Sequence, residues 1–297
     1  MDTEDAAGRT LTVRSPAKIN WALRVVRRRD DGYHDIESLV TPVSLFDELT
    51  FSARERPGIE LSCDTARVPL DANNLIARAA EALAREAGLA RGVRCRLVKR
   101  IPIGGGLGGG SSNAASTLVA LNRLWGLGWP TARLAAVAAR VGSDVPLFLA
   151  GGPVIMRGRG EHVEPARPGW DGWIVLVFPG VEVSTAAVYR EWRAGESVGT
   201  DLARFADRPA DAREWMGWTF NMLEPPAMRV CPALTSWARR LAEVAGRTVR
   251  VSGSGSTLFT AFDEQSQADD FAAAAREQTR LETCVVRPIA PRCRSDG

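Results

Sequence analysis

A glycine-rich segment is the feature of the sequence with the clearest chemical use. Six of the seven residues from Gly104 to Gly110 are glycine, and Leu107 is the exception. The segment follows a predicted strand and leads into a predicted helix over residues 113–125, with Ser111 and Ser112 at its cap. Unpaired backbone amides, a helix N-terminus and two hydroxyls favour a bound phosphate or the magnesium ion that accompanies it. A flexible linker is the alternative, but linkers rarely run straight into a strong helix capped by serines.

Two familiar phosphate loops do not fit this segment. A Walker A loop needs a lysine after its last glycine, and no lysine follows any of these glycines. A dinucleotide-binding loop matches formally at Gly104, Gly106 and Gly109, but it also needs an acidic residue about 20 positions later to bind the ribose. From Ala87 to Ser143 there is no aspartate or glutamate. The missing acid disfavours a nicotinamide-dependent oxidoreductase.

Asp144 and Lys18 are the candidate partners of the glycine segment. Asp144 is the first acid after the long gap, and a carboxylate near a phosphate loop can position or deprotonate an attacking hydroxyl. Only Lys18 and Lys99 are lysines in a chain with 36 arginines, so a lysine in the apolar stretch around residue 18 suggests a compact point charge. The simpler alternatives are a turn-forming aspartate and a lysine whose head lies in solvent. A third glycine segment, Val251–Thr257, is either a tight turn or a second backbone cradle.

The composition limits the class of protein. The chain has 297 residues, a net charge of +3 and 45% hydrophobic residues, which disfavours a disordered polyelectrolyte or a strongly basic nucleic-acid binder. The five cysteines form no CxxC pair and no cluster with histidine, so neither disulfides nor a zinc site are expected. Residues 1–9 read as a polar, flexible tail rather than a signal peptide, and no apolar run is long enough to span a membrane. A cytoplasmic protein is expected.

Hydrophobic periodicity predicts an irregular mixture of strands and helices, which favours two α+β domains over one doubly wound sheet. A Gly- and Arg-rich stretch around Gly158–Gly160 is the candidate domain boundary. The predicted strands are 10–14, 17–26, 47–53, 58–63, 93–101, 173–179, two within 249–262, and 284–288. The predicted helices are 74–88, 113–125, 131–141, 184–192, 233–245 and 265–278.

Three segments in order carry a resemblance to a known family: Ser15–Leu23 (SPAKINWAL), Pro102–Ser116 (PIGGGLGGGSSNAAS) and Val251–Thr257 (VSGSGST). Together they resemble the GHMP kinase superfamily, named for galactokinase, homoserine kinase, mevalonate kinase and phosphomevalonate kinase. Asp31–His34 (DGYH) and Gly142–Gly152 (GSDVPLFLAGG) narrow the match to the branch whose substrate carries a cytidine. The resemblance extends over about residues 10–288.

The resemblance implies a two-domain α+β fold with the active site in the cleft between the domains. Residues 10–157 would form an ATP-binding domain like the second domain of ribosomal protein S5, and residues 158–297 a ferredoxin-like, substrate-binding domain. The implied reaction moves the γ-phosphoryl of ATP to the 2-hydroxyl of 4-diphosphocytidyl-2-C-methyl-D-erythritol, a step of the non-mevalonate route to isoprenoid precursors. ATP with Mg²⁺ would be a co-substrate, and no tightly bound cofactor is implied. The partners would be small molecules, with no nucleic acid or membrane, and the chain a monomer or weak homodimer.

The resemblance also assigns roles to residues of this chain. The catalytic pair would be Lys18 and Asp144. The ATP site would comprise Asn74, Leu75, Lys99, Pro102, Gly104, Gly105, Gly106, Leu107, Gly108, Gly109, Gly110, Ser111 and Ser112, with Ser112 also the best candidate for a magnesium ligand. The substrate site would comprise Asn20, Tyr33, His34, Thr185 and Tyr189, in which aromatic faces hold the cytosine.

The sequence differs from the family pattern at one position in the second half of the chain. Where the family usually carries Asn-Asp-Leu-Glu, Asn221–Glu224 reads Asn-Met-Leu-Glu, and a local effect at a helix start is expected. Two other functions stay open beside the leading one. A kinase of the same superfamily acting on mevalonate or homoserine would have no use for an aromatic slot, and a non-catalytic nucleotide-binding module would not need Lys18 and Asp144.

Overall fold

The computed structural model describes residues 3–4, 10–195 and 199–290 of the chain. They fall into two compact units, each built from several stretches of sequence. Unit 1 comprises residues 1–17, 45–101 and 108–150, and unit 2 comprises residues 18–44, 102–107 and 151–297. The predicted domains are continuous in sequence, with a boundary after residue 157, whereas each compact unit combines several stretches of the chain. The predicted boundary therefore stays a prediction. Of the predicted tail, residues 3–4 form a short strand and the rest lies outside the described residues.

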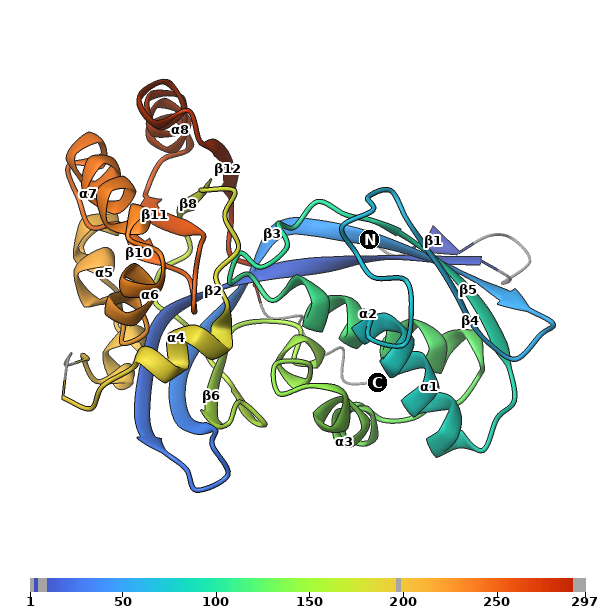
Figure 1. Ribbon diagram of the computed structural model, residues 1–297. Helices are drawn as coiled ribbons and strands as arrows, with labels where there is room; N and C mark the ends of the chain where they lie inside the picture. Colours follow the sequence, from blue (N-terminus) through green and yellow to red (C-terminus); the bar gives the residue numbers. More distant parts are fainter. Residues whose placement is uncertain (1–2, 5–9, 196–198, 291–297) are drawn as a thin grey trace. The chain divides into compact units, whose positions relative to one another are not determined.

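Unit 1 is a sheet with helices on one face (Figure 1). Its strand order is β1-β2-β3-β5-β4, in which β3 and β5 are antiparallel and β5 and β4 are parallel. The strands are β1 (Thr3–Glu4), the first part of β2 (Thr10–Arg28), the last part of β3 (His34–Arg54), β4 (Gly58–Cys63) and β5 (Gly92–Val98). The helices are α1 (Leu75–Ala87), α2 (Gly109–Leu124), α3 (Thr131–Val141) and the 3₁₀ turn η1 (Pro146–Leu149). Apolar residues from the sheet and all three helices form one continuous core, which includes Phe51, Leu83, Leu118 and Val137.

Unit 2 contains two groups of strands. In the first, the remaining parts of β2 and β3 pair with short strands: β6 with β3, β7 with β6, and β9 with β2. The second is a four-stranded sheet of order β10-β11-β8-β12, whose pairings are antiparallel. The strands are β6 (Val154–Gly158), β7 (His162–Pro165), β8 (Trp173–Phe178), β9 (Phe220–Asn221), β10 (Arg250–Val251), β11 (Leu258–Phe262) and β12 (Glu282–Val286). The helices are α4 (Thr185–Glu191), η2 (Leu202–Ala206), α5 (Ala212–Trp218), α6 (Glu224–Val230), α7 (Ala233–Ala245) and α8 (Gln265–Thr279). Apolar side chains of α7 and α8 pack with those of β8, β10 and β11.

Several predicted elements are confirmed, because their local signals are strong. Helices α3 and α7 have the predicted bounds. Helix α1 begins after Asn74, whose side chain accepts the N–H of Ile76, and ends at Gly88 in the left-handed conformation. The mixed α+β class is also confirmed. The four cysteines that the structure describes are free thiols, and Cys293 lies outside the described residues.

Other predicted bounds are wrong. The strands expected at 10–14 and 17–26 are one strand, β2, and β3 starts at His34 rather than at residue 47. Residues 36–43 of β3 are mostly buried on both faces, so the alternation that marks a half-buried strand is absent there. Helix α2 begins at Gly109 instead of Asn113, so the last two glycines of the run are helical. Gly158–Gly160 lies at the turn of the β6–β7 hairpin, and the domain boundary placed there stays a prediction.

Candidate active site

Lys18 lies in unit 2 on β2, where its neighbours direct its side chain. The residue is 5% exposed, and its ammonium donates to Asn20 Oδ1 at 2.6 Å and to the carbonyl oxygen of Gly106 at 2.6 Å. Asn20 in turn donates to Ser38 Oγ at 2.8 Å, which fixes the orientation of the amide. The backbone N–H of Lys18 donates to the carbonyl of Leu107 at 3.0 Å. The structure thus brings the predicted catalytic lysine, a predicted substrate residue and the glycine segment together.

The backbone of the glycine segment explains its composition. Gly104, Gly106 and Gly108 have φ values of 68°, 74° and 69°, which side chains disfavour. The segment divides between the units: residues 102–107 belong to unit 2, and Gly108 is the N-cap of α2 in unit 1, with Ser111 and Ser112 in its first turn. Left-handed residues that alternate with ordinary ones are the conformation from which backbone cradles for anions are built, because successive amides then converge.

The third glycine segment lies against the first part of this loop. Thr257 N donates to the carbonyl of Gly105 at 3.2 Å, and Ser252 Oγ donates to that of Gly106 at 3.2 Å. A Cβ at Gly106 would be 2.2 Å from the carbonyl oxygen of Ser252, so only glycine fits. A Cβ at Gly253 would be 3.1 Å from the ammonium nitrogen of Lys18. Residues 251–257 are therefore part of the lysine's surroundings, rather than an isolated turn.

Asn221 and Glu224 hold that third segment in place. Asn221 Nδ2 donates to the carbonyls of Val251 and Gly253 at 2.8 and 2.7 Å, and Glu224 Oε2 accepts the N–H of Val251 at 2.9 Å. Burial raises the pKa of Glu224, while the charge of Arg250, 3.4 Å away, opposes that rise. The side chain of the methionine that replaces the family's usual aspartate takes no part in these bonds. Asn221 and Glu224, two of the three residues kept from the pattern, are the ones that bind the loop.

An aromatic group surrounds His34 in unit 2. The ring centroids of His34 and Tyr189 are 5.0 Å apart, and Trp192 meets His34 edge-on at 5.6 Å. Burial, followed by the charge of a nearby arginine, lowers the pKa of His34. Tyr33 is 56% exposed and lies under the guanidinium of Arg159, with 5.2 Å between its ring centroid and Cζ. His34 and Tyr189 are thus brought together as predicted, whereas Tyr33 contacts a different partner.

Thr185 is the remaining predicted substrate residue of unit 2. Thr185, the first residue of α4, shares a 2.8 Å hydrogen bond between its hydroxyl and that of Ser254. This bond links the helix that carries Tyr189 to the third glycine segment. The sequence indicated Ser254 only as part of the segment Val251–Thr257. Trp192 was not predicted as a site residue, although it stands three residues after Tyr189, about one helical turn away.

Three residues of the predicted ATP site, Asn74, Leu75 and Lys99, lie in unit 1 near the start of α2. A Cβ at Gly110 would be 3.5 Å from Leu75 Cδ1, and one at Gly109 would be 3.2 Å from Lys99 Nζ. Asn74 caps α1 and also donates from Nδ2 to the carbonyl of Pro69 at 2.6 Å. Both polar atoms of Asn74 therefore bind the chain itself, and its predicted contact with a nucleotide stays a prediction.

Asp144 and Ser112 are also in unit 1. Asp144 is half-buried in the turn just before η1 of unit 1, whereas Lys18 belongs to unit 2. Ser112 is fully buried, and its hydroxyl accepts a 2.7 Å hydrogen bond from Ser15. This side chain is poorly placed for a metal ion. In the described part of the chain, no three or more His, Cys, Asp or Glu side chains group as metal ligands.

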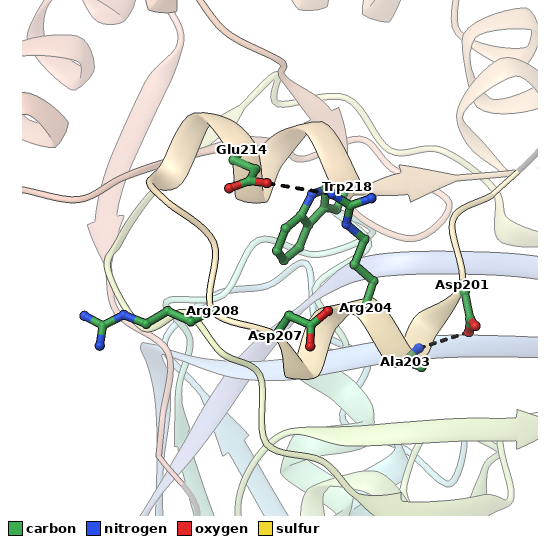
Figure 2. A pocket seen from close by; sticks show the side chains of 7 residues that line it. All are labelled: Asp201, Ala203, Arg204, Asp207, Arg208, Glu214 and Trp218. Carbon is green, nitrogen blue, oxygen red and sulfur yellow. Dashed lines mark hydrogen bonds and ion pairs between the residues drawn. The ribbon is translucent and has the colours of Figure 1, made fainter.

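An open surface pocket of unit 2 has none of the predicted residues in its lining (Figure 2). It is lined by Asp201, Ala203, Arg204, Asp207, Arg208, Glu214 and Trp218, none of which the sequence singled out. Three of these side chains are acidic and two are basic, and Arg204 forms a 3.7 Å ion pair with Glu214. A lining in which carboxylates outnumber the cations offers little to a phosphate.

Comparison with known proteins decides the family. The model of the GHMP kinase N-terminal domain matches residues 74–152, and that of the GHMP kinase C-terminal domain matches residues 202–280. The chain belongs to the GHMP kinases. A 4-diphosphocytidyl-2-C-methyl-D-erythritol kinase of Syntrophus aciditrophicus is 38% identical over 88% of this chain and 92% of its own length. The enzyme of that name from Pelotomaculum thermopropionicum is 37% identical over 95% and 99% of the two chains.

A solved structure agrees with the sequence relatives. The crystal structure of a 4-(cytidine 5′-diphospho)-2C-methyl-D-erythritol kinase superposes with a TM-score of 0.75 at 35% identity, covering 94% of this chain and 99% of its own. The resemblance expected from the motifs is confirmed, and a dinucleotide-dependent oxidoreductase is excluded. Within the GHMP kinases, the sequence identities of 35–38% over most of the chain group it with the 4-diphosphocytidyl-2-C-methyl-D-erythritol kinases. None of the described helices has the length and apolar character needed to cross a membrane.

Proposed function

We propose that this protein transfers the γ-phosphoryl group of ATP to the 2-hydroxyl of 4-diphosphocytidyl-2-C-methyl-D-erythritol, hereafter the cytidyl substrate. Its membership of the GHMP kinases supports the reaction class. The observation that carries the choice of substrate is the pairing of the His34 and Tyr189 rings at 5.0 Å. A planar base binds well against aromatic faces, and mevalonate or homoserine has no base to place there.

The cytosine would enter beside Tyr189, with the His34 imidazole at its polar edge. Trp192 packs edge-on against the imidazole and limits its rotation. The hydroxyl pair of Thr185 and Ser254 joins the helix that carries Tyr189 to the third glycine segment. The base-binding residues and the surroundings of Lys18 are therefore parts of one hydrogen-bonded framework within unit 2.

The phosphates of ATP would bind the amides of the glycine segment and the N-terminus of α2. Lys18, directed by Asn20 and Gly106, would face the transferring phosphoryl group and stabilise the charge that develops on it. Asp144 would position the 2-hydroxyl and accept its proton as the oxygen attacks the γ-phosphorus. The new O–P bond forms as the bond from the γ-phosphorus to the bridging oxygen breaks, and ADP leaves.

Magnesium bound to ATP would neutralise phosphate charge. No step of the proposed mechanism passes through a protein ligand to the metal, because the candidate ligand Ser112 is buried and bonded to Ser15. Cytoplasmic location, the absence of other partners and a monomeric or weakly dimeric state stay predictions. Light scattering of the purified protein at several concentrations tests the last of these.

The decisive experiment is a direct comparison of substrates. The purified protein is incubated with ATP and Mg²⁺ and with the cytidyl substrate, mevalonate or homoserine, and ADP and the phosphorylated product are quantified. We expect a monophosphate ester of the cytidyl substrate and no product from the other two. Comparable turnover of mevalonate or homoserine would refute the proposed substrate, and ATP binding without any product would favour a nucleotide-binding module.

A further inference from the structure

A buried carboxylate in unit 1 is the common acceptor for residues on both sides of the glycine segment. Asp47, in β3, is 0% exposed. Its Oδ1 accepts the backbone N–H groups of Arg100 and Ile101 at 2.7 and 2.8 Å. Its Oδ2 accepts Asn113 Nδ2 at 3.0 Å, and the Lys99 ammonium lies 2.9 and 3.1 Å from the two oxygens. A buried carboxylate is stable only when it is paired and hydrogen-bonded in this way.

The donors come from the two ends of the loop. Arg100 and Ile101 are the residues just before the glycine segment, and Asn113 stands one turn into α2, the helix that the segment enters. Asp47 itself belongs to a strand far from both in sequence. One rigid side chain therefore ties the start of the loop and the helix after it to the sheet of unit 1. We call Asp47, Lys99 and Asn113 the carboxylate clamp.

Lys99 completes the clamp directly beside the first residue of α2. Its ammonium also donates to the carbonyl of Ile101, and a Cβ at Gly109 would be 3.2 Å from its Nζ. The Lys99 side chain is 10% exposed. Burial lowers its pKa, while the charge of Asp47 opposes that effect. The positive charge of Lys99 is thus directed inward, toward the carboxylate.

We propose that Asp47 is a positioning residue for the nucleotide. The carboxylate clamp fixes the separation between residues 100–101 and the first turn of α2, so that the intervening amides are held ready for the phosphates. In this arrangement Lys99 supports ATP binding through Asp47. The proposal rests on the proposed function of the glycine segment as the ATP phosphate site, and it adds a residue that contacts no substrate.

The test is the isosteric substitution Asp47→Asn in the full chain. The amide keeps an acceptor for the two backbone N–H groups but loses the charge opposite Lys99 and turns a donor toward Asn113. We expect the KM for ATP, and the Kd of a fluorescent N-methylanthraniloyl-ADP, to rise by about ten- to a hundredfold, because small misplacements in a site are costly. The KM for the cytidyl substrate should stay within about twofold of the wild-type value.

A merely structural role gives a different pattern. Partial unfolding lowers the active fraction and the apparent kcat but leaves both KM values unchanged, and that result would overturn the proposal. The control is Glu60→Gln on β4 of the same sheet. The Glu60 carboxylate pairs at 2.9 Å with Arg94 of β5. We expect Glu60→Gln to leave both KM values unchanged.

A second variant keeps the proposal testable if Asp47→Asn does not fold. Asn113→Ala leaves the Lys99 ion pair and both backbone bonds of Asp47 in place and removes only the connection to α2. We expect a several-fold rise in the KM for ATP alone, and an unchanged value overturns the positioning role. If the wild-type protein binds no ADP, the proposed function is refuted as well. If the wild-type protein binds ADP tightly and the variants bind it equally well, only the role of Asp47 is refuted.

Discussion

The only two lysines of the chain, Lys18 and Lys99, are both buried, yet their surroundings differ in kind. In unit 2, the Lys18 ammonium donates to Asn20 Oδ1 and to the carbonyl of Gly106 in the glycine segment. In unit 1, the ammonium of Lys99 pairs with the buried carboxylate of Asp47. A cation held at the glycine segment suits the stabilisation of a transferring phosphoryl group, whereas a cation paired with a carboxylate of the sheet suits the construction of a loop. We therefore expect the same rare residue type to serve two purposes.

The largest expected effect comes from removing the charge of Lys18. Lys18→Met should lower kcat by a factor of about 1,000, the scale for losing a preorganised electrostatic contact to the transition state. Binding of N-methylanthraniloyl-ADP and the melting temperature should change little, because Asn20 keeps its hydrogen bond to Ser38. Steady-state kinetics give kcat, fluorescence titration gives the affinity for the ADP analogue, and thermal melts give the stability. If Lys18→Met lowered the melting temperature and left kcat unchanged, the two lysines would not differ in role.

Asp144→Asn should have the next largest effect on turnover. We expect kcat to fall by a factor of about 100 or more, the usual scale for a lost general base, with nucleotide binding largely intact. The half-buried position of Asp144 predicts little change in stability, unlike that of the fully buried Asp47. Single-turnover kinetics with ATP and the cytidyl substrate would measure the chemical step. Near-wild-type rates would contradict the assigned role.

The main effect of Lys99→Met should be a loss of stability. The substitution leaves the Asp47 carboxylate buried without its counter-charge, which typically costs about 3–5 kcal/mol of unfolding free energy. Urea denaturation measures the loss, and Lys18→Met is the natural control in the same assay. If the two variants lose the same unfolding free energy, the proposed difference between the roles of Lys18 and Lys99 is wrong.

Tyr189→Ala tests whether the aromatic residues of unit 2 bind the cytosine of the substrate. Loss of the stacking face should raise the KM for the cytidyl substrate about tenfold, in line with about 1–3 kcal/mol per stacked base, and leave the KM for ATP nearly unchanged. Initial-rate measurements with each substrate varied in turn give both constants. An equal rise in the two constants would show that Tyr189 supports the fold and not the base.

The smallest effect is a shift in the titration of His34. The chain has two histidines, so an NMR titration gives two ring signals, and His162→Gln assigns them. Because burial and the charge of Arg28 lower its pKa, the His34 signal should titrate below the ordinary imidazole value. Stability should accordingly decrease as the pH falls from the ordinary value toward the lowered one, since the unfolded chain binds the proton more readily. Trp192→Ala should move the midpoint upward by exposing the ring, and an unmoved midpoint would show that Trp192 does not bury it.

Local sequence signals predicted much of the helical structure. Helices α3 and α7 were predicted to the residue, because apolar spacing and flanking Pro and Gly residues mark their ends. The first part of β3 was not predicted, since a strand buried on both faces lacks alternation. The early start of α2 was also missed. Glycine has poor helix propensity, and only the packing around Gly109 makes the helical conformation favourable there.

The sequence by itself determined the family and the positions of the glycine segments, Lys18 and Asp144, because close backbone approach and a compact charge restrict residue type strongly. It also showed that lysine, histidine and tyrosine are scarce. The tertiary structure decided what each of them contacts. Residues 251–257 lie on the glycine segment although about 150 positions separate them, and Asp47 meets Lys99 across about 50. Contacts at such separations depend on how strands pair and helices pack, and no local pattern of side chains encodes them.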